Sequence, residues 1–146
     1  MTVPDQNHRD LAVDPARSVL LQAPAGSGKT AVLLLRYLRC LAVVEQPEQV
    51  LAISFTNKAA AEIRQRVIAA LRQPPDGDAD WEQALNRAVH AVLARDKQQN
   101  WRLLDHPGRM RIQTFDSFCI SLAKRRPLLS GVGVLSPSAD PSALYR

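Results

Sequence analysis

The sequence has no long apolar run and no leader-like N-terminus. No uninterrupted apolar stretch approaches the roughly 20 residues that a membrane-spanning helix needs. The first residues are polar and lack the basic-then-apolar order of a secretory signal. These absences predict a protein of the cytoplasm that is not bound to a membrane.

Cysteine is also scarce, with Cys40 and Cys119 as the two copies in the chain. They are far apart, lie in apolar stretches, and show neither a CxxC nor a Cys/His spacing typical of a zinc site. Because a free cysteine usually behaves as a small hydrophobic residue, we expect two buried, reduced thiols.

The remaining composition is that of one ordinary globular unit. The chain has 146 residues, of which 46% are hydrophobic and 23% are charged, enough to build a core. Lysine and arginine total 19 against 14 acidic residues, a net charge of +5. This excess of positive charge favours an anionic partner such as nucleic acid or nucleotide.

Apolar runs typical of strands alternate with runs typical of helices. We expect strands over 18–22, 50–55 and 109–114, and helices over 29–44, 57–72, 81–97 and 116–126, the third helix continuing less regularly to Leu104. Ile63, Val67 and Leu71 are spaced four apart, on one helical face. The alternation predicts an α/β fold with a parallel sheet of about three strands. Residues 75–105 form a helical insertion, and 130–146 begin a further element.

A phosphate-binding loop follows the first expected strand and opens the first long helix, as a Walker A motif requires. Its glycines let backbone N–H groups curl around phosphate oxygens at a helix N-terminus. We expect Lys29 to reach the β- and γ-phosphates of ATP and the Thr30 hydroxyl to bind Mg²⁺. Ala23 replaces the usual first glycine. The predicted phosphate contacts come from Ala23, Pro24, Ala25, Gly26, Ser27, Gly28, Lys29 and Thr30.

Three segments together resemble one family, the UvrD/Rep superfamily of helicases, and especially its helicase–nuclease branch with RecB- and AddA-type subunits. The first segment is residues 23–30, similar to that family's Walker A loop. The second is residues 53–63, Ile-Ser-Phe-Thr-Asn-Lys-Ala-Ala-Ala-Glu-Ile, which resembles motif Ia. The third is residues 113–119, Gln-Thr-Phe-Asp-Ser-Phe-Cys, which resembles motif Ib.

The resemblance implies a P-loop NTPase with a RecA-like lobe, of which this chain is the partial N-terminal segment, and ATP-driven movement on single-stranded or partly duplex DNA in repair or recombination. A fourth segment, residues 5–9, Asp-Gln-Asn-His-Arg, is similar to the place where the family has a glutamine that hydrogen-bonds to the edge of adenine, which implies this role for Gln6. The resemblance also implies DNA contacts by Phe55, Thr56, Asn57, Thr114 and Phe115. A capping role for Thr56 or Asn57 is the alternative. Asp116 is expected to cap its helix, with binding of Mg²⁺ as the alternative reading, and the basic residues 124–126 suit a helix end as well as DNA.

Parts of such a motor are absent from the sequence. Hydrolysis in the family needs an Asp-Glu pair and arginines from a second lobe, so we expect the opening segment of a longer protein, inactive alone, with a possible helicase–nuclease partner subunit. Two alternatives remain open: a non-catalytic module that binds nucleotide or DNA, and a small P-loop kinase.

Overall fold

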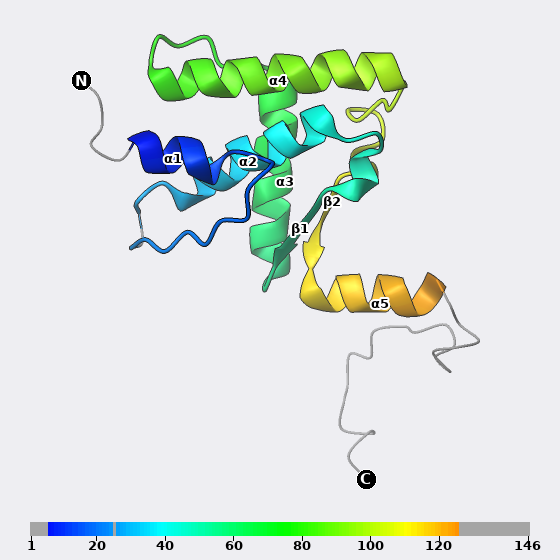
Figure 1. Ribbon diagram of the computed structural model, residues 1–146. Helices are drawn as coiled ribbons and strands as arrows, with labels where there is room; N and C mark the ends of the chain where they lie inside the picture. The colour runs from blue at the N-terminus through cyan, green and yellow to red at the C-terminus, as the bar shows by residue number, and fades with distance from the viewer. Residues whose placement is uncertain (1–5, 25, 126–146) are drawn as a thin grey trace.

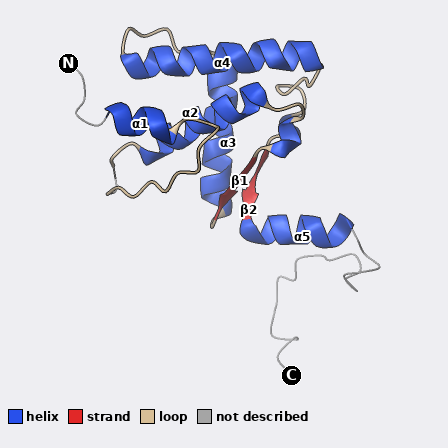
Figure 2. Ribbon diagram, viewed as in Figure 1, coloured by secondary structure: helices blue, strands red, loops and turns tan. Residues whose placement is uncertain are grey.

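A computed structural model describes residues 6–24 and 26–125, and in this part the fold is α/β with a small parallel sheet (Figures 1 and 2). No helix of the described part is both long and apolar enough to span a membrane. The helices are α1 (Gln6–Ala12), α2 (Lys29–Val43), α3 (Asn57–Arg72), α4 (Asp80–Gln99) and α5 (Phe115–Arg125), with 3-10 turns η1 (Pro47–Gln49) and η2 (Pro107–Arg109). The strands are β1 (Leu51–Ser54) and β2 (Arg111–Thr114).

The two strands run parallel, and their register pairs Leu51 with Arg111 and Ser54 with Thr114. Parallel pairing requires a crossover, which α3 and α4 provide. Helix α3 packs against both strands (Figure 1). The expected positions of these two strands and of all four long helices are confirmed within two residues at each end, except for the end of the last helix, expected at residue 126, which lies outside the described residues. Both strands end at the same edge of the sheet, so the residues that follow them are neighbours.

The strand expected over 18–22 is not formed, and that prediction was wrong. The segment is extended, but in the described part no strand bonds to it and the sheet has two strands instead of three. Val19, Leu20 and Leu21 are 43%, 92% and 45% exposed. An apolar run becomes a strand only when a neighbouring strand accepts and donates its ladder hydrogen bonds, and local sequence does not show whether that neighbour is present.

The core lies where α4 packs across α2 and where α3 packs on the sheet (Figure 1). Val67 and Leu71 of α3 are buried, as their spacing predicted. Helix α4 ends at Gln99 and does not continue to Leu104, because Asn100 and Arg102 adopt left-handed backbone conformations with φ of 52° and 58°. The largest fully buried side chains include Trp101, Leu38, Leu41, Leu103, Met110 and Ile112.

The sequence analysis missed one helix and placed one cysteine wrongly. Helix α1 was not predicted, since a helix of 7 residues offers too few turns for a periodic pattern. Cys119 is exposed on α5, so the expectation that both thiols are buried was wrong for this residue. Cys40 is half-buried on α2, and burial raises the pKa of its thiol.

An ion pair joins the turn η1 to the turn η2. Arg109 donates from Nε to Glu48 Oε1 at 2.7 Å and from Nη2 to Glu48 Oε2 at 3.2 Å. Arg109 Nη1 also donates to the carbonyl of Trp101 at 3.0 Å. The hydrogen bond from Arg109 holds the pKa of the Glu48 carboxyl below its ordinary value. This bidentate pair therefore fastens two segments that are distant in sequence.

The pair predicts a pH-dependent contribution to stability. Because the folded-state pKa of Glu48 is depressed, its contribution is present above the ordinary pKa of about 4.3 and is lost as the pH falls through the depressed value. Glu48 is 38% exposed on its side chain, so Glu48→Gln is expected to lower the free energy of unfolding at pH 7 by no more than about 1 kcal/mol. Urea unfolding from pH 7 to pH 3 measures this.

In that experiment the difference between wild type and Glu48→Gln should shrink as the pH falls. Glu62→Gln is the matched control, because Glu62 pairs with Arg66 on an exposed helix face with about half of each side chain accessible, and its effect should be smaller. A difference for Glu48→Gln that stays constant down to pH 3 would contradict the assignment.

Candidate nucleotide site and strand-end surface

The loop before α2 has two glycines in the left-handed region, Gly26 with φ of 78° and Gly28 with φ of 84°. Side chains other than glycine are strained at such angles. Gly28 is the N-cap of α2, and its carbonyl accepts from the N–H groups of Ala31 and Val32 at 3.0 and 3.2 Å. The glycines therefore turn the chain directly into the helix, at the end where N–H groups are available to an anion.

The ammonium group of Lys29 folds back onto this loop. Its Nζ donates to the carbonyl of Ala23 at 2.6 Å and also to the carbonyl of Pro24. Ser27 Oγ donates to the same Pro24 carbonyl at 2.8 Å. Thr30, the predicted Mg²⁺ ligand, is exposed at the start of α2. The loop thus holds a positive charge at its centre through neutral carbonyl acceptors.

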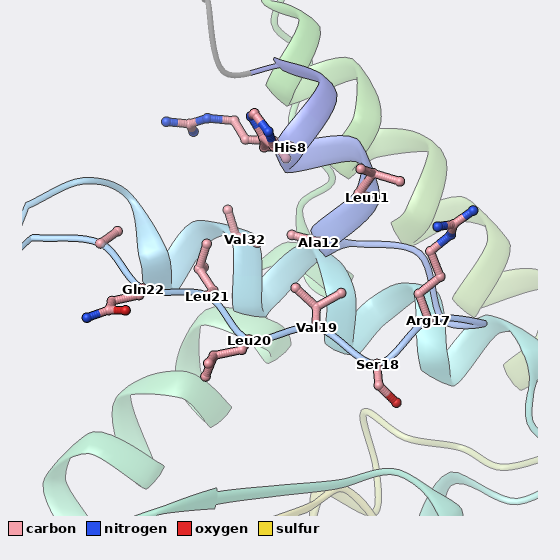
Figure 3. Close-up of a pocket in the computed structure, with 12 residues that line it drawn as sticks. His8, Leu11, Ala12, Arg17, Ser18, Val19, Leu20, Leu21, Gln22 and Val32 are labelled. Carbon is pink, nitrogen blue, oxygen red and sulfur yellow. The ribbon is translucent and has the colours of Figure 1, made fainter.

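Two adjoining cavities open beside this loop. The smaller, of about 290 Å³, is lined by residues of the loop, including Lys29 and Ser27, together with Arg9 of α1. The larger, of about 680 Å³, lies between α1 and the extended segment 17–23 (Figure 3). The cavities share the lining residues Arg9, Leu21, Gln22, Ala23 and Val32. They therefore adjoin one another between the phosphate loop and α1.

The larger cavity is apolar on the side formed by the extended segment. Val19 and Leu21 point toward α1, while Leu20 points away, as in a strand (Figure 3). Leu11 and Ala12 line the cavity from α1. These lining residues were not predicted from the sequence, although the segment 18–22 was recognised as extended. Gln6 begins α1, and both its side chain and Ala25 lie outside the described part.

A second feature is the pair of aromatic residues that follow the two strands. Phe55 is 99% exposed and Phe115 is 56% exposed. Since β1 and β2 are paired in parallel with Ser54 opposite Thr114, these two rings follow neighbouring strand ends. Asn57 is exposed at the start of α3. The edge of the sheet thus presents an apolar surface that the described part of the fold does not cover.

Two threonines cap the helices that leave this edge. Thr56 Oγ1 accepts from the N–H of Ala59 at 3.1 Å, so Thr56 caps α3. Thr114 Oγ1 accepts from the N–H of Ser117 at 3.2 Å, so Thr114 and not Asp116 caps α5. Asp116 lies inside the first turn of α5, and its expected capping role was wrong. Thr114 is 7% exposed, and its hydroxyl is occupied within the protein.

Positive charge lies along α5. Lys124 and Arg125 are exposed in its last turn, and Arg126 lies outside the described part. Arg111 of β2 lies 5.8 Å from the ring centre of Phe118, a distance suited to a cation–π contact. The exposed charges suit the helix C-terminus, where they stabilise the helix dipole.

Comparison with known proteins shows the family. A family model for the UvrD/REP helicase N-terminal domain matches residues 5–134. The chain is 34% identical over 124 residues to an ATP-dependent helicase/nuclease subunit of Anoxybacillus flavithermus, covering 83% of this chain and 9% of that protein. It is 36% identical over 146 residues to the protein of the same name from Moorella thermoacetica, covering 92% and 9%.

DNA helicase II of Salmonella typhimurium is 32% identical over 114 residues, covering 74% of this chain and 16% of that protein. The chain therefore spans a small part of the length of its relatives. No solved structure matches it. The family model covers most of the chain and includes the phosphate loop and both strand ends, so the chain belongs to the family of UvrD/REP helicase N-terminal domains.

Proposed function

We propose that this chain binds ATP with Mg²⁺ through residues 23–30, as the N-terminal ATP-binding segment of a DNA helicase with a RecA-like first lobe. The observation that carries the proposal is the position of Lys29. Its ammonium group lies inside a loop turned by two left-handed glycines, bound to carbonyls of that loop. A phosphate chain offers this ammonium charged oxygen acceptors, which form stronger hydrogen bonds than neutral carbonyls do.

We assign the phosphates of ATP to the smaller cavity and its base to the larger one. Lys29 binds the β- and γ-phosphates, and Thr30 binds the Mg²⁺ that bridges them. The apolar lining of the larger cavity suits a planar base, and Gln6, the first residue of α1, is proposed to hydrogen-bond to the edge of that base. This division is supported by the lining residues, because Ser27 and Lys29 line the smaller cavity and the apolar residues Leu11, Ala12 and Val19 line the larger one.

The strand-end surface is the proposed contact with single-stranded DNA. Exposed aromatic rings stack on bases without regard to sequence, at about 1–3 kcal/mol per base. Phe55 and Phe115 offer two such rings on neighbouring strand ends, and Asn57 adds a polar group at the same edge. Thr56 and Thr114 support this surface by capping the helices behind it.

The whole protein would then be an ATP-dependent DNA motor of repair or recombination. The relatives are named as a helicase and as a helicase/nuclease subunit. We therefore propose that the whole protein acts on single-stranded or partly duplex DNA together with a partner subunit. Hydrolysis by such a motor would need an Asp-Glu pair and arginines supplied by a second lobe. Residues 75–105, which include α4, are proposed to be a helical insertion in the lobe.

A binding experiment tests the DNA part. We expect Phe55→Ala and Phe115→Ala each to weaken binding of a labelled oligothymidine by about tenfold, because each removes one stacking surface. Fluorescence anisotropy at low salt, with an ATP analogue and Mg²⁺ present, gives the affinities. Val43→Ala is the matched control, since Val43 is an apolar residue, 65% exposed, at the end of α2 and is not among the residues that line either cavity or follow a strand, and it should change little. Unchanged affinity in the double phenylalanine variant would refute the DNA assignment.

A further inference from the structure

One arginine of α2 holds together the connection between α1 and the extended segment. Arg36 Nη1 donates to the carbonyls of Ala12 at 2.8 Å and Asp14 at 3.0 Å, and its Nη2 donates to the carbonyl of Arg17 at 2.6 Å. The side chain is half-buried. The guanidinium group presents its donors in a rigid planar fork, which allows one side chain to satisfy several carbonyls at fixed angles.

The bonded carbonyls belong to the two walls of the larger cavity. Ala12 is the last residue of α1, Arg17 is the first residue of the extended segment, and both line the cavity of about 680 Å³, while Asp14 lies between them in the chain (Figure 3). The other hydrogen bonds of this connection are local, such as Asp14 N to Leu11 O and Arg17 N to Asp14 O. Arg36 therefore links both walls to a different element, α2.

Helix α2 also carries the phosphate lysine. Lys29 and Arg36 are seven residues apart in one continuous helix, which places them about two turns and 10 Å apart on the same face. In the described structure Arg36 makes no hydrogen bond to the phosphate loop itself. One rigid helix thus connects the phosphate site at its start to the cavity walls two turns later.

We propose that Arg36 is a positioning residue that fixes the walls of the larger cavity relative to the phosphate loop. This proposal rests on the proposed function, because it assumes that the cavity takes the base of ATP. Without Arg36 the two walls lose their hydrogen bonds to α2 and keep only their apolar packing against it, while the glycine turns and Lys29 keep their own hydrogen bonds. Removing Arg36 should therefore weaken binding of the base of ATP and leave binding of its phosphates unchanged.

The test compares ATP with inorganic tripolyphosphate, which has the phosphates but no base. With wild type, ATP should bind more tightly than tripolyphosphate. Arg36→Met should weaken ATP binding about tenfold, which is the loss expected when about one to two charge-assisted hydrogen bonds no longer order the site. Its affinity for tripolyphosphate should stay within about twofold. Displacement of a fluorescent ATP analogue by each compound, with Mg²⁺, gives both values.

Two more variants complete the design. Arg39→Met is the matched control, because Arg39 lies on the same helix and makes no hydrogen bond to residues 12–17 in the described structure, and it should keep both affinities. Arg36→Lys keeps the charge but loses the fork, so an intermediate loss of ATP affinity is expected. If circular dichroism shows that Arg36→Met does not fold, the lysine variant carries the test.

The outcomes separate this inference from the function on which it rests. Equal losses for ATP and tripolyphosphate would mean that Arg36 supports the fold alone, and unchanged ATP affinity would mean that it positions nothing. Either result overturns the inference. If wild type and Lys29→Ala bind ATP equally well, that result would instead overturn the proposed function.

Discussion

Replacing Lys29 with alanine is expected to weaken binding of ATP with Mg²⁺ by at least about 100-fold. The ammonium group would give two charge-assisted hydrogen bonds to phosphate oxygens, each contributing about 1.5–3 kcal/mol, and a 100-fold loss corresponds to about 2.7 kcal/mol. In the described structure Lys29 bonds to the carbonyls of Ala23 and Pro24. These acceptors can bind water instead, so the folded state should lose less than about 1 kcal/mol.

Isothermal titration with a non-hydrolysable ATP analogue and Mg²⁺ measures the loss. Lys58→Ala serves as the matched control, because it removes the same charge from an exposed position in the first turn of α3. That variant should bind nucleotide as wild type does. An affinity of Lys29→Ala within about threefold of wild type, a limit set by ordinary surface substitutions, would contradict the assigned role.

Replacing Trp101 with alanine should lower the free energy of unfolding by about 3–5 kcal/mol, which is the usual cost of removing a large aromatic side chain from a core. Trp101 is 1% exposed. Its indole Nε1 donates to the carbonyl of Glu45 at 3.1 Å, and its own carbonyl accepts from Arg109. The side chain thus joins the turn after α4 to the end of α2. Such a loss approaches the whole stability of a small domain.

Urea denaturation followed by circular dichroism tests this effect, with Trp101→Phe as the matched variant. Phenylalanine keeps most of the packing but removes the indole N–H, so the loss should be nearer to about 1–2 kcal/mol. A free energy of unfolding for Trp101→Ala within about 1 kcal/mol of wild type would mean that this residue does not organise the core.

Helix positions could be predicted because their causes are local. The spacing of Ile63, Val67 and Leu71 marks the buried face of α3, and the prolines and glycine of residues 73–80 mark the loop that follows. The ends of helices were harder to predict. Asn100 and Arg102 stop α4 through left-handed backbone conformations, and an arginine in that conformation has no pattern in the sequence.

The strand that did not form shows why sheets are harder to predict from the sequence than helices. Residues 18–22 have the apolar character of a strand, and Val19 and Leu21 face one side while Leu20 faces the other (Figure 3). A strand also needs a partner at hydrogen-bonding distance, and that partner is set by tertiary structure. The two strands that do form, β1 and β2, are separated in sequence by α3 and α4.

The candidate site divides in the same way. The phosphate loop is a continuous motif, so its residues could be named from the sequence. Arg36 could not be, because it lies two turns beyond the motif and bonds to residues that no motif contains. Arg9 lies in the segment that drew attention to Gln6, but its place beside the phosphate loop depends on how α1 packs. Phe55 and Phe115 were named through the family resemblance, but their closeness depends on the register of β1 and β2.

ATP binding at the loop opened by Gly26 and Gly28 is the claim on which the other roles depend. Hydrogen exchange of backbone amides, measured with and without a saturating ATP analogue and Mg²⁺, tests it most directly, because phosphate oxygens would bond to N–H groups at the start of α2. We predict slower exchange over residues 23–32 in wild type and no change in Lys29→Ala. Exchange in this segment that is unaffected by bound nucleotide, or protection found only elsewhere in the chain, would contradict it.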